Sequence, residues 1–313
     1  MKGSNMHKCF PVLAVAFLSL CHISIFAQEN NRYGFLYPSA DFNQKRFGAV
    51  MIGEIALSSA VAVGLDFLWY KKFSHSHFHF FNDNKEWLNM DKAGHATTAY
   101  NISAVQYDLM RWSGIDNRKA TLIGGLTGLG VLTIVEIFDG ISQNWGFSNG
   151  DMLANLAGSG LFFAQQTIWN QQRIQLRFSY HQTFYARYNP GELGNTWAQR
   201  LFKDYNGQTY WASFNLSSFL PANNTFPRWL NADMGYGAQG MTGARTNPSC
   251  VDNRQIPQFS RYRKLYFGLG AALKSQGTTA IPYAGWINSI RIPTPVFEWD
   301  LNGSPIKFKT LFN

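Results

Sequence analysis

Residues 121–160 read TLIGGLTGLGVLTIVEIFDGISQNWGFSNGDMLANLAGSG, and this stretch decides the expected fold. Its first half is apolar and glycine-rich and ends in the pair Glu136 and Asp139, and its second half opens with Asp151 and Asn155. Spacings of three and four residues place each pair on one face of a helix. Because the connection between the halves is short and rich in Gly, Asn and Ser, the two helices are expected to run antiparallel.

A third polar pair lies upstream in NMDKAGHATTAY, where Asp91 and His95 stand at the start of a helix expected over roughly 92–112. The connection after that helix is again short. In an up-and-down arrangement, the start of this helix, the end of the next and the start of the third meet at one end. The carboxylates of Glu136 and Asp151 should then lie within roughly 8 Å of the imidazole. The sequence therefore predicts one polar cluster of Asp91, His95, Glu136, Asp139 and Asp151.

The cluster has a chemical and a structural interpretation. Carboxylates at the C-terminal end of a helix oppose the helix dipole, so Glu136 and Asp139 need a cation, a proton or a metal ion. A divalent metal is the candidate cofactor, with His95, Glu136, Asp139 and Asp151 as candidate ligands. In the structural alternative, Lys92 pairs with the carboxylates and Asp151 caps its helix. The sequence favours the two interpretations about equally.

The chain begins with a predicted export signal. Two lysines form a positive start, the segment CFPVLAVAFLSLCHISIF is apolar, and a polar switch at QENNR follows Ala27. Residues 1–27 are therefore expected to be removed. A retained N-terminal anchor and lipidation at Cys21 are the alternatives. The mature chain keeps Cys250 as its single cysteine, so no internal disulfide can form.

Composition favours contact with a membrane and argues against nucleic acid. The formal net charge is +9, and removal of the two signal lysines leaves +7. No basic run is longer than two residues, so an anionic membrane lipid surface or an envelope protein is the expected partner. A charged fraction of 14% beside 26 Phe, 14 Tyr and 10 Trp suits a chain that meets lipid.

Residues 28–170 are expected to form a helical domain. An apolar segment at 48–70 is long enough to cross a bilayer, and further helices are expected over 92–112, 121–139 and 151–169. Rows of small residues predict close helix–helix packing. These rows are Ala56/Ala60/Gly64, Gly124/Gly128, Ala154/Gly158 and Gly160/Ala164.

Residues 171–313 are expected to form a β-rich region. Their segments are short, aromatic and partly alternating, and the dipeptides Asn206-Gly207 and Asn302-Gly303 are hairpin signals. The expected fold class is therefore mainly α, with a four-helix membrane-embedded or membrane-apposed bundle followed by a β-containing, loop-rich C-terminal region.

These motifs carry a resemblance to a known family. The string DKAGH, then E-x-x-D, WGFSNGD and N-x-x-G, resembles the YfiM-type predicted periplasmic lipoproteins over about residues 86–170. The order of motifs is more distantly similar to VanZ-like membrane proteins. The helix ending in WY and the later DYNGQTYW resemble the long, Bacteroidetes-type form. The resemblance implies an envelope location, a helical core and no established reaction, and it marks Asp91, Lys92, His95, Glu136, Asp139, Asp151, Asn155 and Gly158.

Three function classes follow. The first is a non-enzymatic envelope protein that packs against membrane lipid or a partner, with the polar cluster as a structural or binding site. The second is a metal-assisted hydrolase or transferase acting on an envelope lipid or glycan, with His95 as base and the carboxylates as ligands. The third, by analogy, is VanZ-like binding of amphiphilic antibiotics or lipid-linked precursors. All three place the exported protein in the bacterial cell envelope, membrane-associated and facing the periplasm.

Overall fold

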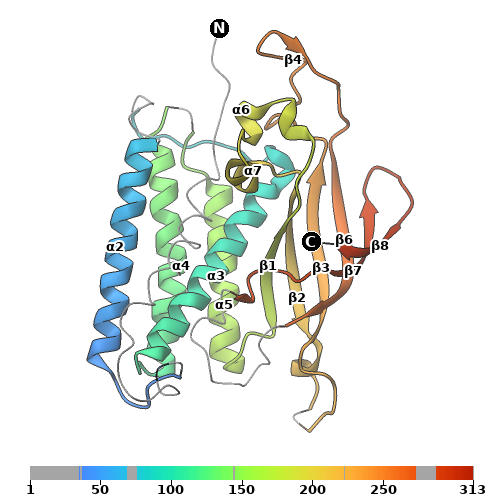
Figure 1. Ribbon diagram of the computed structural model, residues 1–313. Helices are drawn as coiled ribbons and strands as arrows, with labels where there is room; N and C mark the ends of the chain where they lie inside the picture. The colour runs from blue at the N-terminus through green and yellow to red at the C-terminus, as the bar shows by residue number, and fades with distance from the viewer. Residues whose placement is uncertain are drawn as a thin grey trace.

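A layer of helices lies against one face of an antiparallel sheet in the computed structural model (Figure 1). The model describes residues 35, 37–68, 76–143, 145–221, 223–272 and 287–312, so the predicted export signal lies outside the described residues. The helices are α2 (Gln44–Leu68), α3 (Met90–Trp112), α4 (Asn117–Gly140), α5 (Asn149–Trp169), α6 (Pro190–Leu193) and α7 (Trp197–Lys203).

The strands pair in the order β1-β2-β3-β6-β7-β8, and every neighbouring pair is antiparallel. They are β1 (Ile174–Tyr180), β2 (Gln208–Asn215), β3 (Leu230–Gln239), β6 (Tyr262–Ala271), β7 (Thr294–Asp300) and β8 (Lys307–Phe312). A separate two-stranded ribbon consists of β4 (Cys250–Val251) and β5 (Arg254–Gln255). As predicted, Asn302-Gly303 lies in the turn between β7 and β8, where Gly303 adopts a φ of 90°.

The expected four-helix membrane-embedded or membrane-apposed bundle, and with it the mainly α class, is wrong. The described residues form six α-helices beside a six-stranded sheet, so the fold combines α and β layers. Helices α3, α4 and α5 pack together, whereas the start of α2 joins them through Val50 beside Leu109 and Trp112. The expected span at 48–70 falls mostly in α2. Among the described residues, α4 is the single helix long and apolar enough to cross a membrane, and 39% of its most apolar stretch is buried.

The strands are part of the main core, which the periodicity of single segments could not reveal. Met90 at the start of α3 packs with Tyr210 of β2 and with Tyr205 and Met241 in the loops beside the sheet. Further along α3, the hydroxyl of Tyr100 donates to the carbonyl of Ile174 at 3.1 Å. Four residues separate the end of α5 from the start of β1, close to the domain boundary predicted at residue 170. The division into a helical domain at 28–170 and a β-rich region at 171–313 stays a prediction.

Glycines let the three helices approach closely. A Cβ on Gly128 would lie 2.1 Å from Ser103 Oγ of α3, and a Cβ on Gly158 would lie 2.0 Å from the carbonyl oxygen of Ala96. Gly160, two residues further along α5, faces open space. The rows containing Gly128 and Gly158 therefore pack as expected, and the row starting at Gly160 does not. In the first row, Ala60 and Gly64 lie outside the described side chains.

The sheet face turned away from the helices is buried, and it carries charged side chains beside an apolar cluster of Trp211, Tyr266, Val296 and Phe312. Arg291 Nε donates to Asp233 Oδ2 at 2.8 Å, and both side chains are fully enclosed. Lys264 lies 3.2 Å from Glu298 and 3.4 Å from Asp300. Residues 289–291 pair with the free edge of β1, because Phe178 N donates to Ser289 O at 2.7 Å and Arg291 N donates to Phe178 O at 2.9 Å. The sheet therefore curls around a charged interior.

We predict opposite effects for two alanine substitutions on α5. Gly158→Ala should lower the free energy of unfolding by about 2 kcal/mol or more, because its methyl group would overlap the α3 backbone. Gly160→Ala should raise it by about 0.5–1 kcal/mol, since alanine favours a helix and meets open space there. Denaturant unfolding of both variants tests this, and equal effects would contradict the packing described for α5.

We predict that stability falls as the pH drops from about 6.5 toward 4. Burial, with help from Lys309 and Lys264 and opposed by Glu298, lowers the pKa of His181 to about 4 in the folded protein. The unfolded chain therefore binds the proton first, so this contribution is complete above pH 6.5 and is lost below pH 4. Between pH 6.5 and pH 4, the free energy of unfolding should change by about 2 kcal/mol less in His181→Phe than in the native protein.

Candidate functional site

The starts of α3 and α5 and the end of α4 meet at one end of the helical layer. They bring together Asp91 and His95 of α3, Glu136 of α4 and Asp151 of α5. All four side chains are between 1% and 3% exposed. The topology inferred from the three polar pairs is therefore present, and we call these four residues the polar cluster.

His95 Nε2 faces three carboxylate oxygens without touching any of them. It lies 3.7 Å from Glu136 Oε1, 3.9 Å from Asp151 Oδ1 and 4.0 Å from Asp91 Oδ1. These distances exceed those of hydrogen bonds. On the other side of the ring, Nδ1 lies 3.0 Å from Asn155 Oδ1. An amide oxygen only accepts, so this contact places a proton on Nδ1.

Lys92 supplies positive charge beside the polar cluster, as the structural alternative predicts. Its ammonium lies 2.5 Å from Asp83, 2.7 Å from Asp151 and 3.5 Å from Asp91. Asp83, in the loop before α3, is a buried carboxylate that sequence reasoning missed. A single acidic residue in a loop gives no local signal of such a role.

Ser148 connects the end of α4 to the start of α5. Its backbone N–H donates to Glu136 Oε2 at 3.0 Å, and its hydroxyl donates to Asp83 Oδ1 at 2.7 Å. The same hydroxyl accepts from the backbone N–H of Asp151 at 3.1 Å, so Ser148 caps α5 and the expectation of Asp151 as the cap is wrong. The spacing Ser-x-x-Asp in SNGD matches a helix-start signature that could have identified this serine.

Two further residues complete the comparison with the predicted cluster. Among the described residues, the oxygens within 4.0 Å of His95 Nε2 belong to Asp91, Glu136 and Asp151, so half-buried Asp139 lies outside this group. The hydroxyl of Tyr205 donates to Asp91 Oδ1 at 2.7 Å from a loop beside the sheet. No sequence pattern could place Tyr205 here, because the contact joins residues far apart in the chain.

The carboxylates of the polar cluster favour positive charge nearby, and this shows in the pKa values of their neighbours. Burial alone would lower the pKa of His95, but the carboxylates of Asp151, Asp91 and Glu136 together raise it to about 9. Burial and the neighbouring charge of Asp91 raise the pKa of Asp151 to about 8, although His95 and Lys92 oppose the shift. The same carboxylates keep Lys92 protonated, since they raise its pKa despite burial.

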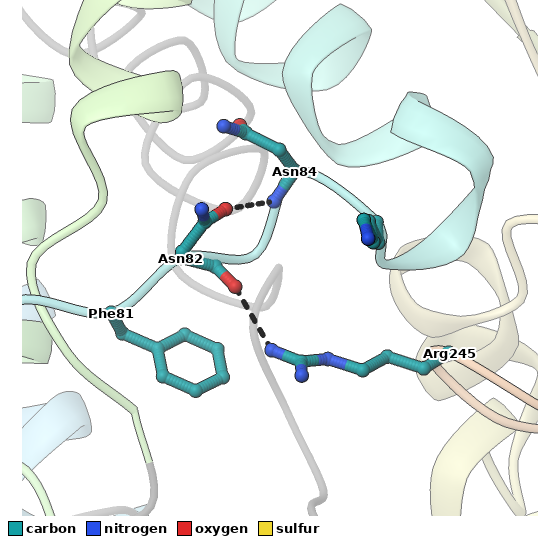
Figure 2. Close-up of a pocket in the computed structure, with 5 residues that line it drawn as sticks. Phe81, Asn82, Asn84 and Arg245 are labelled. Carbon is teal, nitrogen blue, oxygen red and sulfur yellow. Dashed lines mark hydrogen bonds between the residues drawn. The ribbon is translucent and has the colours of Figure 1, made fainter.

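A surface hollow lies on the outer side of the loop that carries Asp83. It is lined by Phe81, Asn82, Asn84, Lys85 and Arg245 (Figure 2). Arg245 Nη2 donates to the carbonyl of Asn82 at 2.9 Å, and the guanidinium lies 5.3 Å from the centre of the Phe81 ring. Asp83, in the same loop, is only 1% exposed and does not line the hollow.

Comparison with known proteins gives one match. Residues 79–166 match a family described as "Predicted periplasmic lipoprotein (DUF2279)", and this range contains the whole polar cluster. The match confirms the resemblance to predicted periplasmic lipoproteins and the expectation of an exported, periplasm-facing envelope protein. The finer likenesses to the YfiM-type and VanZ-like proteins stay predictions. No curated protein and no solved structure matches the chain.

We predict that Lys92 is essential for stability. Lys92→Met should lower the free energy of unfolding by about 3 kcal/mol, because it leaves buried carboxylates without their nearest cation. Lys119→Met is the matched control: its pair with Asp116 lies at the surface, where solvent screens the charges, so the free energy of unfolding should stay nearly unchanged.

Asp83→Asn in the Lys92→Met background should recover part of the loss, since it removes one of the carboxylates that Lys92 pairs with in the native protein. Denaturant unfolding in detergent measures all three effects. A Lys92→Met protein as stable as the native one would show that the carboxylates do not depend on this lysine.

Proposed function

We propose that the protein is a non-enzymatic envelope protein that lies against a membrane and binds its lipid through an apolar outer surface. The observation that carries this proposal is the inverted polarity of the sheet at β6–β8. In a water-soluble sheet the covered face is apolar and the solvated face is polar. At β6–β8 the charged side chains of Lys264, Glu298 and Asp300 are covered together with Tyr266 and Val296, whereas Phe267, Phe297 and Phe308 on the opposite face are exposed.

The exposed apolar patch of the sheet consists of Met234, Phe267, Phe297 and Phe308. These side chains stand directly opposite one another on the four neighbouring strands β3, β6, β7 and β8. Their exposed fractions range from 37% to 57%. Behind them, on the other face, Lys264 and Glu298 are nearly fully buried. Four adjacent large apolar side chains form a patch of the kind that marks an interaction surface, and lipid tails suit it without any specific groove.

The helical layer adds a second apolar area, the outer helical face. Between Lys119 and Glu136, α4 carries no ionisable residue, and α5 carries none after Asp151. The exposed residues of this face are Leu122, Leu126, Ile134, Ile137 and Phe138 of α4 and Leu153, Leu156, Phe163 and Ile168 of α5. Two unrelated elements thus expose large apolar side chains, which favours a fluid bilayer over one shaped protein partner.

The end of the helical layer opposite the polar cluster is basic and aromatic. The start of α2, the end of α3 and the start of α4 share a core there. The guanidinium of Arg46 lies 5.0 Å from the centre of the Trp112 ring, and that of Arg173 lies 4.7 Å from the Trp169 ring. Arg and Trp side chains of this kind are typical of membrane interfaces, where they meet anionic headgroups.

Burial of His95 supports this class over the catalytic alternative. A base that is 3% exposed and enclosed by carboxylates does not meet a lipid or glycan substrate in this structure. The polar cluster then serves to hold three helices together.

We predict that the purified protein floats with vesicles of phosphatidylglycerol and phosphatidylethanolamine and that carbonate does not release it from membranes. Leu126→Lys, Leu156→Lys and Phe297→Lys should each weaken partitioning at least tenfold, because each loses roughly 1.5–3 kcal/mol of apolar transfer energy. Gln258→Lys, an exposed polar position, adds the same charge and should partition like the native protein.

Circular dichroism should show that all four variants remain folded, since every substituted side chain is exposed. Native protein that stays with the soluble fraction would overturn the proposal. Binding to native envelope membranes but not to pure lipid vesicles would instead assign the apolar surface to a protein partner.

A further inference from the structure

We propose that His95, Asp91, Glu136 and Asp151 bind one divalent transition-metal ion, with Zn²⁺ or Mn²⁺ as the class of ion. The donor atoms are His95 Nε2, Asp91 Oδ1, Glu136 Oε1 and Asp151 Oδ1. The site does not depend on lipid binding, so the two proposals succeed or fail separately.

The first argument is that buried oxygen atoms in the polar cluster lack hydrogen-bond partners. Glu136 Oε1 and Asp151 Oδ1 are enclosed, and neither has a hydrogen bond within the described part of the chain. Asp151 Oδ1 does have the ammonium of Lys92 at 2.7 Å, whereas Glu136 Oε1 faces only the imidazole. A fully buried carboxylate oxygen without a donor is costly, and a metal ion is one of the few partners that can satisfy it.

The second argument is the spacing of the donor atoms. Two ligands that bind the same cation at about 2.0–2.4 Å lie roughly 3–4 Å apart. The three distances from His95 Nε2 to carboxylate oxygens are 3.7, 3.9 and 4.0 Å. The donor atoms of Asp91, His95 and Asp151 all lie within 4.8 Å of one another. A small contraction would therefore bring them around one ion.

The third argument is that neighbouring groups orient the ligands. Asn155 Oδ1 accepts from His95 Nδ1, which leaves Nε2 directed at the carboxylates, where a metal ion would displace the Nε2 proton. Ser148 N–H holds Glu136 Oε2, so the other oxygen, Oε1, points toward His95. Tyr205 donates to Asp91 Oδ1, the proposed ligand atom itself, and so fixes the position of that oxygen. Outer partners of this kind are typical of metal sites.

Charge balance gives the fourth argument. The polar cluster and Asp83 contribute four buried carboxylates, and Lys92 contributes one positive charge to three of them. An imidazolium at His95 would add one more charge, but charge-assisted hydrogen bonds are about 2.7–2.9 Å long, and no carboxylate oxygen comes that close to Nε2. A divalent ion adds two charges at the point where the oxygens converge.

The mixed ligand set indicates the class of metal. Ca²⁺ and Mg²⁺ prefer sites made of oxygen alone, whereas an imidazole nitrogen with carboxylates suits Zn²⁺ and Mn²⁺. In this site the ion would tie the start of α3 to the end of α4 and the start of α5. Its role is to hold the helical layer together, because no described ligand is exposed to substrate.

The test uses the untagged mature protein with Cys250→Ser, since the exposed thiol could bind metal on its own. The protein is stripped with a chelator, incubated with Zn²⁺ or Mn²⁺, desalted and analysed for bound metal and for its melting temperature. Co²⁺ serves as a spectroscopic probe, because its visible absorption changes when nitrogen and oxygen ligands replace water. We expect about one ion per chain and a melting temperature that rises with the metal concentration.

Two variants and one matched control locate the ion. Glu136→Gln keeps the size of the side chain and removes the unpaired charge, so it should fold and bind Zn²⁺ or Mn²⁺ at least tenfold more weakly. His95→Gln should lose the Co²⁺ spectrum. Glu298→Gln changes a buried carboxylate of the sheet that is paired with Lys264, and it should bind like the parent protein.

Failure of the parent protein to retain an ion, or equal affinity in Glu136→Gln and the parent, would overturn the proposal. His77 is an exposed histidine in the loop before α3. Binding that disappears in a His77→Gln control would assign the metal to that loop, and would overturn the proposal as well. Because the parent protein alone can give a negative result, a misfolded variant does not leave the question open.

Discussion

The helical layer depends on the neutralisation of buried carboxylates at one of its ends. Asp91, Glu136 and Asp151 come from three different helices and converge on His95 Nε2. Burying them without a cation would cost several kcal/mol, on the order of a small domain's whole stability. Lys92 offsets part of this cost, and the proposed metal ion would offset more. The packing of α3, α4 and α5 therefore depends on the positive charge that Lys92 places beside these carboxylates.

A second charged interior lies on the far side of the sheet. Arg291 with Asp233, and Lys264 with Glu298, are enclosed where a soluble protein of this size usually places apolar side chains. Trp211, Tyr266 and Val296 are buried beside these charges. On the opposite face, Phe267, Phe297 and Phe308 are exposed, as are large apolar side chains of α4 and α5. This arrangement suits an envelope protein in contact with lipid, where no water is available to hydrogen-bond a charge on the outer surface.

The candidate site was largely predictable because its residues lie at helix ends. Helix periodicity places Asp91 and His95 on one face, and short connections bring Glu136 and Asp151 to the same end. Asp83 and Tyr205 could not be predicted, because each reaches the cluster from a segment without a periodic pattern. The fold class was mispredicted for a related reason. The strands were recognised as local segments, but their pairing into one sheet with a shared helical core depends on contacts distant in sequence.

The sequence by itself determined the helices α3–α5, their antiparallel order and the apolar nature of α4, and the export signal stays a prediction from it. These follow from local composition and spacing, which act between residues a few positions apart. Tertiary structure alone decided that Gly158 contacts a backbone while Gly160 does not, and that the face of β6 and β7 with Lys264 and Glu298 is covered. Each of those outcomes depends on which face of an element meets another element. A pattern of alternating residues is the same whichever side is buried, so only the packed structure can select the side.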